Sequence, residues 1–162
     1  QAEDGIRDRS PSRGLGDVYK RQRLQHAQAQ DRNTDPSVLD DLAGSDDPGE
    51  RLLVALNPST PDETLDRLAG DEHPQVAEAA SSRLLQRTLF AAQDPSTPPE
   101  TLGLMAGSSN AEVRWAVACN PSAPTQVIEA LVTDADPEVR AAAVEHPNAP
   151  SWGTAAGGLV AD

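Results

Sequence analysis

Aromatic residues and cysteine are scarce in this chain of 162 residues. Aromatic residues make up 2% of it, as two Trp, one Tyr and one Phe, and Cys119 is the single cysteine. One cysteine excludes an intrachain disulfide and a four-cysteine zinc or iron–sulfur site within this chain. The core must be built from Ala, Leu and Val, which suits closely stacked helices, so we expect an elongated repeat structure.

Long apolar runs are also missing. No segment approaches the ~18 consecutive apolar residues of a membrane-spanning helix, and no charged-then-apolar secretory leader is seen. We therefore expect a cytoplasmic protein with no membrane partner.

Residues 1–22, QAEDGIRDRSPSRGLGDVYKRQ, differ in character from the rest and contain the only lysine, Lys20. The whole string resembles the in-frame translation of a sequencing-library adapter, which implies an artefact that is disordered. The natural protein then begins at or before Arg23. We expect the chain to be a fragment of a longer protein, taken from metagenomic sequence. The net charge of the whole chain is −13; residues 1–22 hold 4 acidic and 5 basic residues, which leaves 22 acidic residues against 8 arginines, or −14.

A helical pattern recurs from residue 31 onward. Steps of 26, 37 and 26 residues separate the members of two apolar columns, which are Leu39, Leu65, Leu102 and Ile128, and Leu42, Leu68, Met105 and Leu131. The pattern predicts an all-α solenoid of about four to five helix-turn-helix repeats of 26 residues, starting near residues 31, 57, 94, 120 and 146. An 11-residue insertion near 83–93 would lengthen a helix or add one, and residues 23–30 read as the tail of a preceding repeat.

Each repeat carries start signals for two helices. In Asn57-Pro58-Ser59-Thr60-Pro61 the prolines end the previous helix, and Thr60 is expected to cap the next one with Glu63 in a capping box. Thr97 is expected to form the same capping box with Glu100. In Asp134-Ala135-Asp136-Pro137-Glu138, Asp136 is expected to cap the second helix.

At NPSTPDETLDRLAGDEHPQVA and NPSAPTQVIEALVTDADPEVRAAAV the chain resembles the leucine-rich repeat variant family, a bacterial relative of HEAT-type α-solenoids. The resemblance covers residues 31–150. It implies alternating short and longer helices wound into a right-handed superhelix. One member type carries an N-terminal iron–sulfur module that nothing here matches, so we expect no cofactor.

Sites for metals or catalysis are not indicated by spacing along the chain. His26, His73 and His146 form no metal motif, the latter two are expected to cap or lie on the surface, and no EF-hand-like ligand series is present. Cys119 ends a helix, where a buried structural thiol is expected. We therefore predict a protein without enzymatic activity and with no catalytic, cofactor or metal site.

Two polar features are candidates for binding another protein. Arg51, Arg114 and Arg140 share one column, which either forms a ladder of ion pairs or faces an acidic partner. Trp115 lies in a column of varied residues, which predicts partial exposure at an interface or packing against the insertion.

The leading hypothesis is a non-enzymatic scaffold for protein–protein interaction. Its net charge favours a basic partner over nucleic acid. One alternative is an accessory repeat region of a larger enzyme or HEAT-like lyase, and another is nucleic-acid binding through a concave groove.

Overall fold

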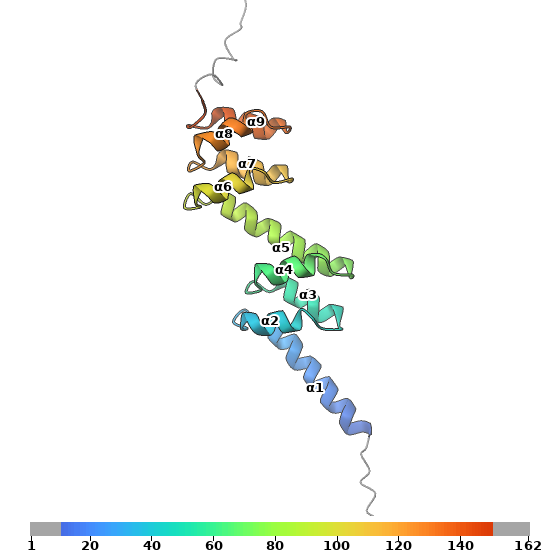
Figure 1. The fold of residues 1–162 in the computed structure, drawn as a ribbon. Coiled ribbons are helices and arrows are strands. Elements are labelled where there is room, and N and C mark those ends of the chain that lie inside the picture. The colour runs from blue at the N-terminus through green and yellow to red at the C-terminus, as the bar shows by residue number, and fades with distance from the viewer. Residues whose placement is uncertain (1–10, 151–162) are drawn as a thin grey trace, which may run out of the picture. The chain divides into compact units, whose positions relative to one another are not determined.

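The computed structural model describes residues 11–150, with side chains from Gly16 onward. This part of the chain forms nine α-helices and no strand (Figure 1). The helices are α1 (Pro11–Gln30), α2 (Pro36–Leu42), α3 (Pro48–Leu56), α4 (Asp62–Ala69), α5 (Pro74–Gln93), α6 (Pro99–Met105), α7 (Ala111–Cys119), α8 (Thr125–Leu131) and α9 (Pro137–Glu145).

The prediction that residues 1–22 are disordered is wrong for residues 11–22, which are helical. Residues 11–22 are the first part of α1, whereas residues 1–10 lie outside the described residues, as does the C-terminal segment 151–162 with Trp152. Residues 16–24 of α1 are all exposed, so the buried part of this helix lies in residues 25–30.

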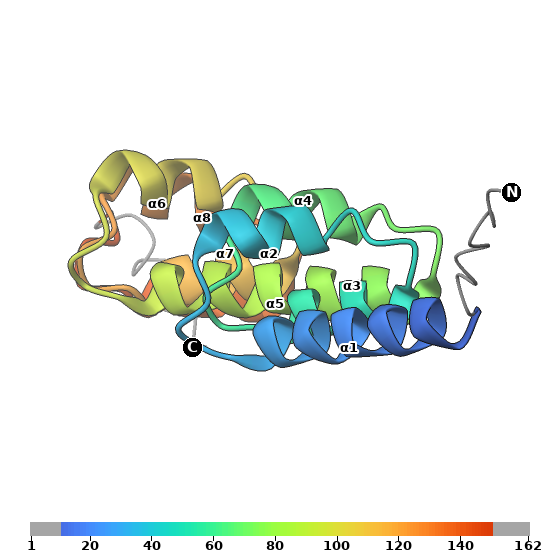
Figure 2. The same ribbon diagram turned by 90° about the horizontal axis from the view of Figure 1, so that it is seen from below.

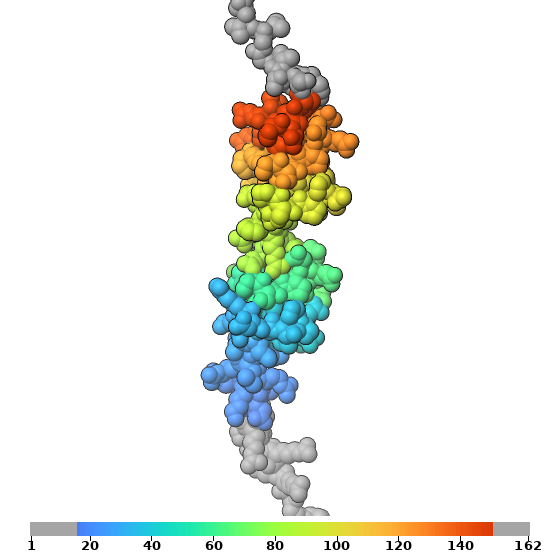
Figure 3. All heavy atoms as spheres, turned by 90° about the vertical axis from the view of Figure 1, so that its left-hand side faces the viewer, coloured from blue at the N-terminus to red at the C-terminus, as the bar shows by residue number. Residues whose placement is uncertain are grey.

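Contacts divide the chain into two compact units, Gln1–Leu84 and Leu85–Asp162. In the first unit the short helices α2 and α4 form one layer over α1, α3 and the start of α5. In the second unit α6 and α8 lie over α7 (Figure 2), and α9 packs against α7 and α8. In the space-filling view, successive turns of the chain within each unit stack on one another (Figure 3). The predicted all-α repeat architecture is thus confirmed in each unit.

The apolar columns form the core of each unit. Leu39, Leu65, Leu102 and Ile128 are all fully buried, as are Val76 and Val139, and Val113 is 2% exposed. Val54, Ala55 and Ala80 fill the first core and Ala116, Val117 and Ala143 the second, each with 0% exposure. Small side chains allow the layers to approach closely, which explains why so few aromatic residues are needed.

The insertion near residues 83–93 lengthens a helix rather than adding one. Helix α5 is continuous over 20 residues; its first half contributes Val76 and Ala80 to the first core and its last turn contributes Ala92 to the second. Helix α1 has the same length as α5 and ends 63 positions before it, at Gln30 and Gln93. The order of one long helix followed by three short ones therefore occurs twice, as α1–α4 and as α5–α8, and positions 63 apart are equivalent.

Helices α3, α7 and α9 begin with side-chain caps of the kind predicted for Asp136. Asp136 accepts hydrogen bonds from the backbone N–H groups of Glu138 and Val139, and Asp47 and Asn110 cap α3 and α7 in the same manner. Such a cap satisfies backbone donors that would otherwise lack partners at the helix start.

The predicted capping boxes at Thr60 and Thr97 are wrong. Helices α4 and α6 have Pro61 and Pro98 at their caps, with no side-chain bond to the helix. The threonine hydroxyls instead donate backwards, Thr60 to the carbonyl of Val54 and Thr97 to that of Ala91, at 2.6 Å each. They thereby satisfy last-turn carbonyls of the preceding helix, which also need partners.

A buried asparagine joins consecutive turns of each unit. Asn57 is 2% exposed; its Nδ2 donates to the carbonyls of Ala29 (2.8 Å) and Asp31 (2.9 Å), and its Oδ1 accepts from the N–H of Ser59. The hydroxyl of Ser59 donates to the carbonyl of Arg32. We call this arrangement the Asn–Ser clamp.

The second unit repeats the Asn–Ser clamp with Asn120 and Ser122. Asn120 is 1% exposed; its Nδ2 donates to the carbonyls of Ala92 (2.7 Å) and Asp94 (3.0 Å), and Ser122 donates its hydroxyl to Pro95 (2.6 Å). The Asn-Pro-Ser signature therefore fixes one turn of the chain against the turn before it.

Candidate functional site

Two arginines of the predicted column, Arg51 and Arg114, are held by carboxylates within their own unit. Arg51 on α3 is 8% exposed, and it donates from Nε and Nη2 to the two carboxylate oxygens of Asp71 at 2.7 and 2.9 Å. Its Nη1 donates to the carbonyl of Ser45 at 2.8 Å. The guanidinium thus ties the loop before α3 to the loop before α5.

The second unit has the same arrangement. Arg114 donates from Nε and Nη2 to Asp134 at 2.8 Å each, and from Nη1 to the carbonyl of Ser108 at 2.9 Å. Hydrogen bonds from Arg51 and Arg114 hold the pKa of Asp71 and of Asp134, respectively, below its ordinary value of 3.8. Both pairs have the fork-to-fork geometry in which arginine binds carboxylates most strongly.

Arg140 has no such carboxylate fork within the described part of the chain. Its Nη1 donates to the backbone carbonyls of Asp134 (2.6 Å) and Ala135 (2.9 Å). Arg51 and Arg114 thus form ion pairs, as in the first alternative, whereas Arg140 fixes its loop through backbone carbonyls. Arg51, 8% exposed, has little surface left to offer a partner.

Trp115, the fourth candidate, lies on α7 with its side chain 42% exposed. It lines a hollow of about 550 Å³ between α7 and α9, whose floor includes Ala118, Ala141 and Ala142. A second hollow of about 300 Å³ shares Trp115 and extends to Ala111. We call this region the Trp115 face.

Carboxylates surround the Trp115 face. Glu138 and Glu145 line the larger hollow, while Glu112, Asp136 and again Glu138 line the smaller one. Cys119 and His146 also line the larger hollow, together with Pro147. None of the residues lining either hollow is a lysine or arginine, so both hollows are acidic.

Cys119 does not have the predicted buried position. Its side chain is exposed at the end of α7, although partial burial raises the pKa of the thiol, which opposes formation of the nucleophilic thiolate. His146, in contrast, is 6% exposed, and its Nε2 lies 2.9 Å from the carbonyl oxygen of Asn120. Its role is to fix the turn that follows α9.

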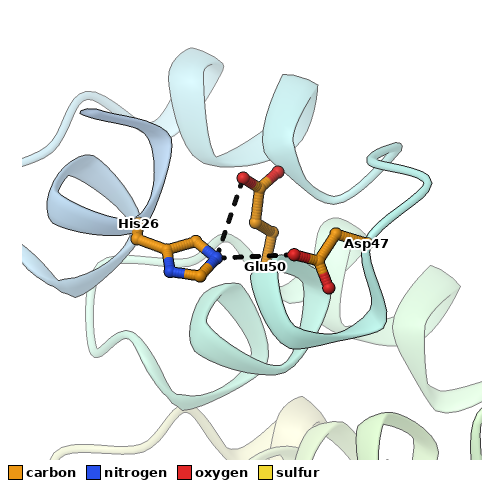
Figure 4. Close-up of side chains that lie close together, drawn as sticks. All are labelled: His26, Asp47 and Glu50. Carbon is orange, nitrogen blue, oxygen red and sulfur yellow. Dashed lines mark ion pairs between the residues drawn. The ribbon is translucent and has the colours of Figure 1, made fainter. Parts of the chain in front are cut away.

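The third histidine lies in a cluster that reading along the sequence missed. His26 of α1 faces Asp47, the cap residue before α3, and Glu50 of α3, with Nε2 at 3.5 Å from Oδ2 of Asp47 and 3.8 Å from Oε1 of Glu50 (Figure 4). Each of the three residues offers one ligand atom, and these atoms lie within 4.8 Å of one another. The residues come from α1 and from the start of α3, so no local motif announces them. A signal was present, because Glu50 occupies a column that otherwise holds apolar residues, which are Leu24, Val76, Val113 and Val139.

The nine helices of the described residues, with their repeated caps and clamps, define an α-helical repeat protein. A family model of the Leucine Rich Repeat Variant domain matches residues 23–84 and 86–148. The chain belongs to this family, and the two matched blocks correspond to the 63-residue layout seen in the structure. Comparison with curated proteins and with solved structures gives no match. Within the described residues, no helix is long and apolar enough to cross a membrane.

Proposed function

We propose that this protein is a non-catalytic repeat scaffold that binds another protein through the Trp115 face. The partner is a basic segment with an apolar or aromatic side chain beside its positive charges. The observation that carries the proposal is the half-exposed indole of Trp115 between two hollows whose charged lining residues are carboxylates.

The indole supplies the apolar part of such an interface. Tryptophan is among the residues most enriched at binding hot spots, where it anchors a partner in a pocket that excludes water. Ala118, Ala141 and Ala142 leave room beside it for an incoming side chain. The neighbouring Arg114 is not needed for this role, because its guanidinium is bound to Asp134.

The carboxylates supply the charge complement. Glu112, Asp136, Glu138 and Glu145 line the two hollows, and the chain as a whole has a net charge of −13. A basic partner is attracted to such a surface, mainly through a faster and salt-dependent association. The same charges disfavour nucleic acid, whose backbone requires a basic surface. A role as an accessory region of a larger enzyme is compatible with this binding mode and concerns sequence outside the chain.

The test is selection of peptides from a random displayed library with the full chain, followed by titration of the selected peptides. We expect enrichment of Lys and Arg next to an apolar residue. Trp115→Ala should weaken binding by at least about 2 kcal/mol, roughly 30-fold. Glu138→Lys should slow association and reduce its dependence on salt.

Leu104→Ala is the matched control, because Leu104 is an apolar residue of the same unit with 81% exposure that lines neither hollow. It should leave the affinity within about twofold. Selection of acidic peptides, or equal losses for Trp115→Ala and Leu104→Ala, would refute the proposal.

A further inference from the structure

The cluster of His26, Asp47 and Glu50 in the first unit contains buried polar atoms without hydrogen-bond partners. Glu50 is 2% exposed, and its Oε1 finds no donor among the residues that the structure describes; Nε2 of His26 is likewise buried and makes no hydrogen bond there. These two atoms face each other at 3.8 Å (Figure 4). A buried carboxylate oxygen without a partner is costly, so its persistence requires an explanation.

The remaining polar atoms of the cluster are used to orient it. Oε2 of Glu50 accepts from the hydroxyl of Ser45 at 2.6 Å, and the same hydroxyl oxygen accepts from the backbone N–H of Asp47 at 3.1 Å. Oδ1 of Asp47 accepts from the N–H of Gly49 as the cap of α3, which leaves Oδ2 toward His26. Ser45 and the cap thus hold Oε1 and Oδ2 toward one point.

The second unit lacks this chemistry at the equivalent positions. Positions 63 residues further along hold Leu89, Asn110 and Val113 in place of His26, Asp47 and Glu50. The fold is therefore built in the second unit with two apolar residues and a neutral cap. The histidine and the buried carboxylate of the first unit are not required by the repeat.

We propose that His26, Asp47 and Glu50 bind a divalent transition-metal ion of the zinc class. Ligand atoms ~2.0–2.1 Å from a tetrahedral zinc ion lie about 3.3–3.4 Å from each other. The observed separations of 3.5 and 3.8 Å from Nε2 of His26 are close to this spacing, and all three atoms lie within 4.8 Å of one another, so the carboxylates would have to move closer together on binding. One imidazole with two carboxylates suits such an ion better than calcium, which takes six to eight oxygen ligands.

The surroundings leave room for a further ligand and favour a cation. The side chains of His26 and Asp47 are 44% and 43% exposed, so water can complete the coordination. Beside them is a hollow of about 420 Å³, whose lining includes four carboxylates and one arginine: Asp41, Asp46, Asp47, Glu50 and Arg21. A bound ion would clip α1 to α3.

A protonated His26 bridging the two carboxylates is the competing explanation. Charge-assisted hydrogen bonds to carboxylates are ~2.7–2.9 Å long, whereas the two separations here are 3.5 and 3.8 Å and Nε2 makes no hydrogen bond. The distances suit an ion between the groups better than a shared proton.

The experiment is calorimetric titration of the full chain with zinc chloride, with cobalt(II) absorption as a second readout of coordination geometry. We expect one saturable site and a zinc-dependent rise in Tm. His26→Leu and Glu50→Val, which introduce the residues of the second unit, should each weaken binding by roughly 100-fold or more, and Ser45→Ala by roughly 10- to 100-fold. The His26→Leu and Glu50→Val variants should remain folded, because each introduces the residue that the fold accepts 63 positions away.

Cys119→Ser is the matched control, because Cys119 is an exposed potential zinc ligand in the other unit. It should leave the affinity unchanged. Absence of saturable binding up to ~1 mM zinc, a Kd limit that corresponds to about −4 kcal/mol, would overturn the proposal. So would equal binding by the His26→Leu variant, or His26 NMR resonances that respond to pH but not to zinc.

Discussion

Replacing Asn120 by alanine tests whether the Asn–Ser clamp stabilises the stacked turns. The side chain is 1% exposed and makes three hydrogen bonds, from Nδ2 to Ala92 and Asp94 and from the N–H of Ser122 to Oδ1. Each such bond contributes ~0.5–1.5 kcal/mol net, so the three together contribute about 1.5–4.5 kcal/mol. The substitution leaves backbone groups without partners inside the protein, which places the expected cost at about 3–4 kcal/mol.

Urea unfolding followed by far-UV circular dichroism measures this cost, and the corresponding fall in Tm is roughly 6–16 °C. Asn33→Ala is the control, because Asn33 is exposed in a loop and should change stability by at most about 0.5 kcal/mol. Asn120→Asp keeps the shape but turns a carboxylate oxygen toward two carbonyls, so it should be at least as destabilising as alanine. If Asn120→Ala costs no more than Asn33→Ala, the clamp does not hold the turns together.

Further predictions concern acidity, the core and the N-terminal segment. The folded pKa values of Asp71 and Asp134 lie below the ordinary 3.8, so the stability that these carboxylates add to the fold is fully present above about pH 4 and is lost as the pH falls through the folded values. Replacing both by asparagine should therefore flatten the acid side of a stability–pH curve, and an unchanged slope would contradict this. Leu65→Ala, at a fully buried position, should cost about 2–5 kcal/mol in urea unfolding. Deleting residues 1–22 should lower the Tm by only about 2–4 °C, since residues 16–22 are exposed. A larger fall in Tm would show that this segment stabilises the fold.

The fold could be predicted from the periodic spacing of the apolar residues. Leu65 and Ile128 recur with fixed spacing, and a position that repeats in this way faces the same neighbour in every turn. For the same reason Asp136 could be recognised as a cap, because its partners lie two and three residues away. Patterns confined to one helix and its start can be read along the chain.

Interactions between turns were harder to predict. Thr60 had the sequence context of a capping box, but its hydroxyl binds Val54, six residues earlier, because the last carbonyls of α3 compete for the same donor. The fork between Arg51 and Asp71 spans 20 residues, and the sequence alone left its partner open.

The His26 cluster was missed because its residues come from α1 and from the start of α3. His26 and Asp47 are 21 positions apart, and their proximity depends on how α1 lies against α3. The one local clue was Glu50, a charged residue in a column of otherwise apolar residues. A mismatch between a residue and its column thus identified a candidate site better than any short motif did.

The Asn–Ser clamp has a consequence for how such chains grow. The side-chain donors of Asn57 and Asn120, and of the serines two positions after them, bind main-chain carbonyls of the preceding turn. Every residue type offers that carbonyl, so the clamp does not restrict which side chains precede it. A gene segment that is duplicated next to itself therefore encodes a copy that already fits its neighbour, and the outward-facing positions are free to diverge afterwards.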